Sequence, residues 1–324
     1  MNSCKLLLVL LLCCSLHLHA RTHSVADSTE VLGEVDSAHP IQIYAPLLKY
    51  VFFEKGSAEI PKRYLMFTSP QEANKFTLDS VHGNAIMCYY HILNIIGYRL
   101  RNNLTSKLTI VGCNDNNTMR TSPEELREGL SKQRATVVYN YLKDIWQIPE
   151  TQLKLLYRNL PERPSNPKDS LGVLENRRVE LQCDDWEISK PINQKGYWFK
   201  NDIENEKSYD VLRIELIDVN WMRKNIGKNN ERALMEYVIP KILSGDTIDL
   251  FSNDIDYLEG NQKATNYSQV YTIDLMKKKL QSTRKNVTFI AFTGADYPIY
   301  ETIFNHPENL MFNRYMSITI KRKK

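Results

Sequence analysis

An arginine at the centre of an apolar helix stripe is the feature of this chain that most constrains its fold. At about 100° per residue, Arg134 falls near the middle of the apolar face of a predicted helix that ends near Trp146. The apolar members of this face are Leu126, Leu130, Val137, Tyr141 and Ile145. A guanidinium that faces a core needs a fixed partner, because an unpaired buried charge is strongly destabilising. Asp115, at the end of the preceding predicted strand, is the nearest candidate, and the pair is either a ligand site or an internal ion pair without a ligand.

Length and composition predict a globular protein with two small domains. The chain has 324 residues, more than one ordinary core of about 100–150 residues requires. Its hydrophobic content of 42% and charged content of 25% are typical of soluble globular proteins. The net charge of +4 is spread widely, and the only dense basic run, at 321–324, is interpreted as a solvated tail. We therefore expect no nucleic-acid partner.

Residues 1–20 have the pattern of a secretory signal peptide. Lys5 supplies a positive charge, an apolar run follows at 6–12, and Ala20 is a small residue before a candidate cleavage site. Lipid attachment at Cys14 is an alternative, disfavoured because the residue before it is not Gly, Ala or Ser. No later apolar run reaches the roughly 18 residues that span a bilayer. We expect an exported protein whose residues 21–43 form a flexible leader.

Three cysteines lie outside the signal segment, and they are Cys88, Cys113 and Cys183. An odd count does not make a disulfide framework, and no Cys-x-x-Cys spacing suggests zinc. Cys113 and Cys183 lie in predicted strands and could form a bridge only if those strands are neighbours, so buried free thiols are the favoured interpretation. No histidine is placed near Cys113 by the sequence, and we expect neither an enzyme nor a metal or cofactor site.

Hydrophobic periodicity predicts the order β-α-β-α-β-β in the first half of the chain. A helix start is indicated by Ser122, Pro123 and Glu125, which fit a cap, a first helical residue and a capping-box acid. The predicted strands are 48–54, 108–111, 153–157 and 177–182, and the predicted helices are 79–101 and 123–146. The region 160–170 is predicted to be a long loop, and the stretch around Pro61 and Pro70 an irregular one.

A weaker echo of the same order follows in the second half. The predicted strands are 211–217, 247–251, 287–292 and 316–320, and the predicted helices are 229–243 and 269–281. We interpret the two halves as a duplication in the α+β class: a domain at 44–183, a linker at 184–209 and a second domain at 210–324.

Four motifs of the first half, taken in order, resemble the OmpA-like peptidoglycan-binding domain. They are Tyr50–Ile60, Gly112–Asp115, the Leu-Ser-Lys-Gln-Arg-Ala run at 130–135, and the Asn-Arg-Arg-Val-Glu-Leu run at 176–181. The resemblance covers about 46–182. It implies a two-layer β-α-β-α-β-β fold with helices on one face of the sheet, in agreement with the order read from the periodicity.

The resemblance also implies a ligand site for the diaminopimelate of the peptidoglycan stem peptide. By position, Asp115 would pair with the ammonium of the ligand, and Arg134 would hold its carboxylate in a bidentate fork. Asn114, Arg127 and Arg178 are weaker candidates. The chain departs from the family pattern at Gly-Cys-Asn-Asp, where GHTD or GYTD is usual, and in a longer loop after Asp115.

The second half resembles a degenerate copy of the same domain. Asn253 and Asp254 follow its second strand, but Tyr271 stands in the place of the arginine, and tyrosine cannot provide a charged fork. The sequence thus predicts an envelope protein of the periplasm or outer membrane that binds peptidoglycan without catalysis and anchors an outer-membrane or envelope component to the wall. The alternative is an envelope scaffold that keeps the fold, contacts protein partners and has lost the ligand.

Overall fold

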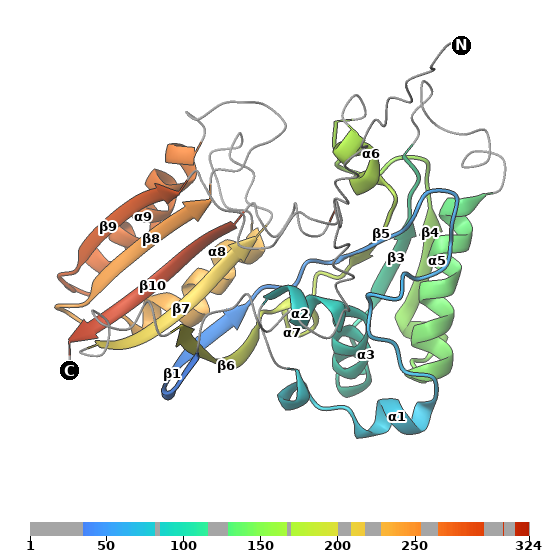
Figure 1. The fold of residues 1–324 in the computed structure, drawn as a ribbon, viewed down its shortest axis with the longest axis horizontal. Helices are drawn as coiled ribbons and strands as arrows, with labels where there is room; N and C mark the ends of the chain where they lie inside the picture. The colour runs from blue at the N-terminus through green and yellow to red at the C-terminus, as the bar shows by residue number, and fades with distance from the viewer. Residues whose placement is uncertain are drawn as a thin grey trace, which may run out of the picture.

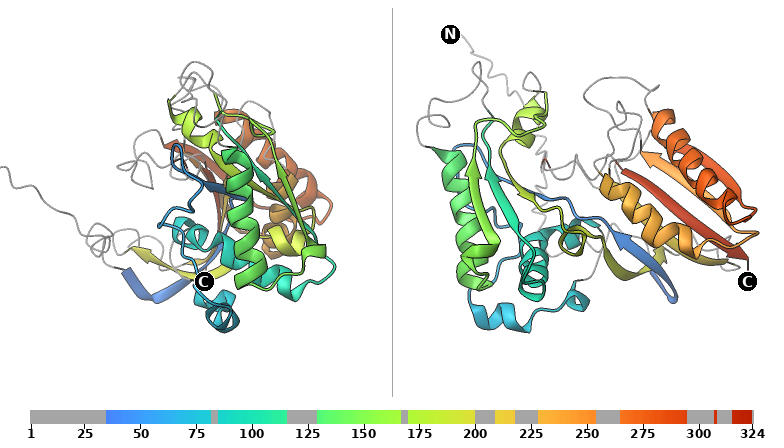
Figure 2. Two further views of the ribbon diagram at one scale, coloured as in Figure 1. Left: turned by 90° about the vertical axis from the view of Figure 1, so that its right-hand side faces the viewer. Right: turned by 180° about the vertical axis from the view of Figure 1, so that it is seen from behind.

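The computed structural model contains a six-stranded and a four-stranded sheet, which lie in separate halves of the molecule (Figure 1). Each sheet carries helices on one face (Figures 1 and 2). The structure describes residues 35–81, 85–115, 129–166, 170–199, 209–217, 228–253, 265–294, 307 and 315–323. The predicted signal peptide lies outside these residues.

The four-stranded sheet has the order β2-β5-β3-β4. Strand β5 runs antiparallel to β2 and to β3, and β3 runs parallel to β4. The strands are β2 (Tyr50–Phe52), β3 (Leu108–Gly112), β4 (Leu153–Tyr157) and β5 (Arg178–Gln182). The strands predicted for the first half are present: β3, β4 and β5 match their predicted ranges to within one residue, whereas β2 is shorter than the predicted 48–54.

Helices cover the face of this sheet that Val179 and Leu181 share. They are α1 (Pro70–Lys75), the short η1 (Leu78–Ser80), α2 (Ala85–Tyr90), α3 (Ile92–Asn102), α5 (Leu130–Asn140), its π-helical extension η2 (Tyr141–Ile145) and η3 (Glu150–Gln152). Another helix, α6 (Ser170–Asn176), precedes β5, and its Glu175 carbonyl accepts a hydrogen bond from Arg178. The sequence predicts an irregular stretch around Pro70, but this stretch forms helix α1. Ser69 caps Glu72 N, and Pro70 occupies a first-turn position where its missing N–H costs nothing. The predicted helix start at Ser122 lies outside the described residues.

A glycine sets the distance between α5 and the sheet. A Cβ at Gly112 would lie 1.8 Å from the carbonyl oxygen of Ser131, so only glycine lets the helix approach β3 this closely. Because Gly112 ends β3, this contact also places Arg134, one turn along α5, beside the residues that follow the strand.

The six-stranded sheet has the order β6-β1-β7-β10-β8-β9. Its strands are β1 (Val35–Ala45), β6 (Ile192–Phe199), β7 (Tyr209–Ile217), β8 (Thr247–Asn253), β9 (Thr288–Gly294) and β10 (Tyr315–Lys323). Its helical segments are α8 (Lys228–Ala233), continued by η6 (Leu234–Val238) and η7 (Ile239–Lys241), and α9 (Thr265–Gln281). Four of its strands, β7-β10-β8-β9, repeat the order and the strand directions of the smaller sheet.

Two predicted irregular segments are in fact partly strands. The predicted leader at 21–43 includes most of β1, and the predicted linker at 184–209 includes α7 (Trp186–Ser189) and β6. Strand β1 pairs with β6, about 150 residues further along the chain, and in parallel with β7, about 170 residues further along, so no local pattern signals these partners. Pro40 is tolerated because the pairing with β6 shifts register between Asp36 and Pro40.

The sequence predicts a solvated tail for the basic run at 321–324, but its residues 321–323 lie in strand β10. Arg322 lies in β10 and donates from Nε and Nη2 to the Asp246 carboxylate at 3.0 and 2.9 Å. Lys321 forms an ion pair of 2.8 Å with Asp249. The charges of this run therefore hold the strand to its neighbours.

Cys88, Cys113 and Cys183 are buried free thiols, as the sequence analysis favoured. Burial raises the pKa of the Cys113 thiol to about 11, and the nearby Glu180 carboxylate adds to this shift. In the parts of the chain that the structure describes, no helix combines the length and apolar character needed to cross a membrane.

Candidate functional site

The guanidinium of Arg134 joins the end of β3 to the turn that follows β2. Its Nε donates to Ser57 O at 2.9 Å, and its Nη2 donates to Glu54 O at 3.2 Å. Its Nη1 donates to Cys113 O and to Asn114 Oδ1, both at 3.2 Å. The Arg134 side chain is 0% exposed. The fixed partners that the sequence requires for Arg134 include three backbone carbonyls, those of Glu54, Ser57 and Cys113. Carbonyl oxygens are strong acceptors for a buried cation.

Asp115 forms its ion pair with Arg177. Arg177 Nε donates to Asp115 Oδ2 at 2.8 Å, and both side chains are buried. The sequence predicts Asp115 as the nearest partner for Arg134, and Arg177 is not among the residues predicted for the site. The signal that could have found Arg177 is the Asn-Arg-Arg-Val-Glu-Leu run, since two adjacent arginines beside a strand point to opposite faces of the sheet.

Asn114 is placed between the two charged groups. Its backbone N–H donates to Asn159 O at 2.7 Å, and its side-chain oxygen accepts the bond from Arg134. The residue is 2% exposed. Asn114, Asp115 and Arg134 are therefore gathered where β3 ends, as the sequence predicts for site residues at the carboxyl end of a strand.

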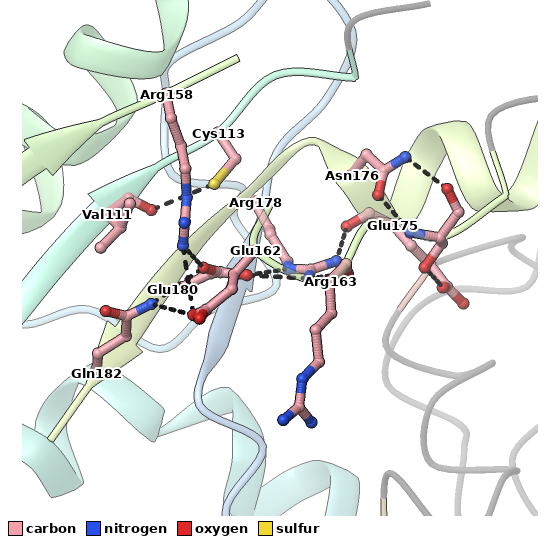
Figure 3. Close-up of polar contacts among 11 residues, drawn as sticks. Val111, Cys113, Arg158, Glu162, Arg163, Glu175, Asn176, Arg178, Glu180 and Gln182 are labelled. Carbon is pink, nitrogen blue, oxygen red and sulfur yellow. Dashed lines mark hydrogen bonds and ion pairs between the residues drawn. The ribbon is translucent and has the colours of Figure 1, made fainter. Parts of the chain in front are cut away.

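Arg178 belongs to a different buried cluster, with Glu180, Arg158 and Glu175 (Figure 3), and alternation along β5 places it on the face opposite to Val179. Its guanidinium donates to Glu180 Oε1 at 3.0 Å and to the carbonyls of Glu175 and Arg163 at 2.9 Å, and it lies 4.4 Å from the centroid of the Tyr50 ring. On its other side, Glu180 accepts a bond of 2.5 Å from Arg158. Arg178 therefore fixes the loop after β4 to β5 and is not brought to Arg134. Arg127, the remaining candidate, lies outside the described residues.

In the larger sheet, Tyr271 occupies the helix position that the sequence compares with Arg134, and it bonds through a hydroxyl instead of a guanidinium. Tyr271 of α9 donates to Glu231 Oε1 of α8 at 2.6 Å, and this hydrogen bond raises the pKa of the tyrosine. Thus Tyr271 joins two helices, whereas Arg134 joins a helix to strand ends. Asp254 lies outside the described residues.

Within the described part of the chain, no group of three or more His, Cys, Asp or Glu side chains is placed to hold a metal ion. The arrangement around Arg134 and Asp115 contains two cations and one carboxylate, all buried at the end of a strand. Chemically, such a group is suited to noncovalent recognition of charged groups by hydrogen bonds.

Three solved structures are similar to part of this chain. The peptidoglycan-associated lipoprotein of Burkholderia pseudomallei is 16% identical, with 42% of this chain and 91% of that chain covered and a TM-score of 0.29. The OmpA-like domain of FopA1 from Francisella tularensis is 12% identical, with coverages of 42% and 74% and a TM-score of 0.26. The C-terminal domain of Helicobacter pylori MotB is 17% identical, with coverages of 48% and 89% and a TM-score of 0.24. No protein-family model matches the chain, and no curated protein matches it.

Proposed function

We propose that the unit built on the four-stranded sheet binds peptidoglycan noncovalently. The observation that carries this proposal is the convergence of the four motifs that resemble the OmpA-like domain. Arg134, from the third motif, bonds to carbonyls of the first and second motifs, and Arg177, from the fourth, bonds to Asp115 of the second. Segments up to 80 residues apart along the chain thus meet at the two side chains to which the resemblance assigns ligand contacts.

The ligand would be the diaminopimelate of the stem peptide, which carries an ammonium and a carboxylate on its side chain. Asp115 would receive the ammonium and Arg134 the carboxylate, with Asn114 as a neighbouring amide. In this role the exported protein anchors an outer-membrane or envelope component to the wall. The proposed interaction involves no bond making or breaking and no cofactor.

A second candidate, an envelope scaffold without a peptidoglycan ligand, is favoured by one observation. All three nitrogens of the Arg134 guanidinium donate to atoms of the protein, and Asp115 already has Arg177 as a partner. A ligand would have to share these groups or displace internal bonds, at a cost in binding free energy. The two candidates therefore differ in whether this charged group serves a ligand or only the fold.

The second half is proposed as a degenerate copy of the same domain that does not bind diaminopimelate. The support is the strand order β7-β10-β8-β9, with directions that match β2-β5-β3-β4. Tyr271 supplies no cation at the helix position that we compare with Arg134. This half is then available for contacts with protein partners.

Retention of the mature full-length chain on purified sacculi tests the proposal. The informative variant is Asp115→Asn, which removes the carboxylate charge but keeps an oxygen that can accept the bond from Arg177. Its matched control is Asp144→Asn, because Asp144 lies in η2 and its side chain is 61% exposed. A thermal melt of each variant measures folding separately.

We expect Asp115→Asn to weaken retention by about 30-fold or more, since a charge-assisted contact to a ligand contributes about 2 kcal/mol or more. Asp144→Asn should bind like the unmodified chain. Equal retention of both variants, with both folded, would reject the ligand role and leave the scaffold as the function.

A further inference from the structure

Tyr157 is a large aromatic residue at the surface beside the candidate site. It is the last residue of β4, an edge strand of the four-stranded sheet, and it is 56% exposed. An exposed tyrosine ring offers an apolar face and a polar tip, a combination common in binding surfaces. Its distance from Asp115 suits a ligand that contacts both residues.

The sheet register places Tyr157 on the helix side of the sheet. Tyr157 pairs with Gly112, whose Cβ position points at Ser131 of α5, so the side chain of Tyr157 leaves the sheet on the same side. Lys132 of α5 has its ammonium 5.9 Å from the centroid of the tyrosine ring. Leu156, the preceding residue, leaves the sheet on the opposite side and is 41% exposed.

The separation between Tyr157 and Asp115 matches the length of a short peptide. Gly112 precedes Asp115 by three residues, and neighbouring strands lie about 4.8 Å apart, so the backbones of Tyr157 and Asp115 are within about 11 Å. An extended peptide of three residues spans at most about 10–11 Å. In peptidoglycan, diaminopimelate is the third residue of the stem counted from the sugar. A stem held at Asp115 can therefore bring its sugar to Tyr157.

We infer that Tyr157 and Lys132 form a sugar subsite for the glycan strand of peptidoglycan. The face of a pyranose that carries axial C–H bonds would stack on the tyrosine ring. The ammonium of Lys132 would donate hydrogen bonds to hydroxyl or N-acetyl oxygens of the same sugar. This inference rests on the proposed function and extends it from the stem peptide to the disaccharide that carries the stem.

Two probes separate the subsite from the stem-peptide site. One is a disaccharide-tripeptide with diaminopimelate as its third residue, and the other is the same tripeptide without sugars. Isothermal titration of the full-length chain gives the dissociation constant of each probe. The variants are Tyr157→Ala, Tyr157→Phe and Lys132→Ala, with Leu156→Ala as the matched control on the other face of the strand.

We expect the unmodified chain to bind the disaccharide-tripeptide about 10-fold more tightly than the tripeptide, the scale of one aromatic contact. Tyr157→Ala should remove this difference without changing tripeptide binding. Tyr157→Phe should keep it, because stacking needs no hydroxyl, and Lys132→Ala should reduce it. Leu156→Ala should leave both constants unchanged.

Several outcomes would overturn the subsite. These are equal binding of the two probes by the unmodified chain, no effect of Tyr157→Ala on the disaccharide-tripeptide, or an equal effect on both probes. If the tripeptide binds in these cases, the proposed function stands alone. Binding of the disaccharide-tripeptide that depends on Tyr157, without any tripeptide binding, would support the subsite and reject the role of Asp115 and Arg134. Failure of both probes would reject both proposals.

Discussion

The two halves of the molecule arrange four strands in one order but hold their helices in different ways. In the sheet β2-β5-β3-β4, helix α5, which follows β3 in the chain, is bonded to the strand ends by the buried guanidinium of Arg134. In β7-β10-β8-β9, helix α9, which follows β8 in the chain, is bonded to helix α8 by the hydroxyl of Tyr271. One strand order is thus compatible with a helix held by a buried guanidinium or by a tyrosine hydroxyl bonded to a carboxylate.

In the described part of the chain, only the half that contains the buried Arg134 guanidinium has the charged groups needed to recognise a charged ligand in the way proposed. A buried cation at strand ends gathers carbonyls, an amide and a second ion pair around it, and such a group can exchange an internal bond for one to a ligand. The hydroxyl of Tyr271 bonds to the Glu231 carboxylate between two helices, which contributes to stability without a buried cation. Four predictions test this contrast.

The largest expected effect is that of Arg134→Ala on stability. The substitution leaves carbonyl acceptors of Glu54, Ser57 and Cys113 without the donors that they now have, so we expect a loss of about 3–5 kcal/mol in the free energy of unfolding. Urea denaturation measures it. Arg134→Lys, which keeps the charge but has fewer donors in another geometry, should lose less. A change below about 1 kcal/mol for Arg134→Ala would show that the tie is dispensable.

Arg177→Ala is expected to cost about 3 kcal/mol, because it removes the ion-pair partner of a buried carboxylate. The double variant Asp115→Ala, Arg177→Ala should lose less than the sum of the two single variants, since residues in one ion pair are energetically coupled. A double-mutant cycle on urea unfolding gives this coupling. Additive losses would mean that the two side chains are held by other contacts.

Tyr271→Phe is expected to cost about 1 kcal/mol, the usual value of one hydrogen bond between a neutral donor and a partly exposed acceptor. The same urea experiment measures it, and Glu231→Gln serves as the partner control. Sacculus retention should not change. A loss as large as that of Arg134→Ala would remove the contrast between the two halves.

The smallest expected effect concerns the junction between the halves, where Ser106 donates to the carboxylate of Asp185 at the start of α7. This hydrogen bond lowers the pKa of Asp185, and the bond from Glu187 N adds to the shift. The contribution to stability is present above the ordinary aspartate pKa of about 3.9 and is lost as the pH falls through the lowered value. We expect Ser106→Ala to destabilise the chain slightly at pH 7 and progressively less as the pH falls below about 3.9, as thermal melts over this range would show. An equal difference at every pH would assign the effect to packing.

Most strand positions could be predicted from the sequence because they depend on local alternation. Strand β4 begins and ends where the period-two pattern does, and β3 and β5 differ from their predictions by one residue. By contrast, β1 and β6 could not be predicted because their stability depends on each other and on β7. Domain boundaries drawn at 44 and 210 consequently cut through the larger sheet.

The position of the candidate residues at the end of β3 could be predicted from the sequence, but the pairing of Asp115 with Arg177 could not. The sequence placed Asn114, Asp115 and Arg134 together, but it favoured Arg178 over Arg177. Strand alternation decides between the two: Arg178 shares a face with Glu180, two residues on, and bonds to it. Arg177, the residue before β5, forms the ion pair with Asp115. The pairing of β5 with β3 brings these two residues together, and neither segment alone predicts that pairing.

The pairing of β1 with β6 has a consequence for the order of folding. Ala45 lies opposite Ile192, so the chain leaves the larger sheet, builds the smaller unit and returns to the same point. The smaller unit is therefore an insertion, complete once β5 has been synthesised, whereas β10, between β7 and β8, arrives with the last residues of the chain. During synthesis, β1 must wait for partners encoded far downstream, and until they are made its unpaired edges are exposed to mispairing. A C-terminal truncation that removes β10 should then leave the inserted unit folded and the larger sheet unformed.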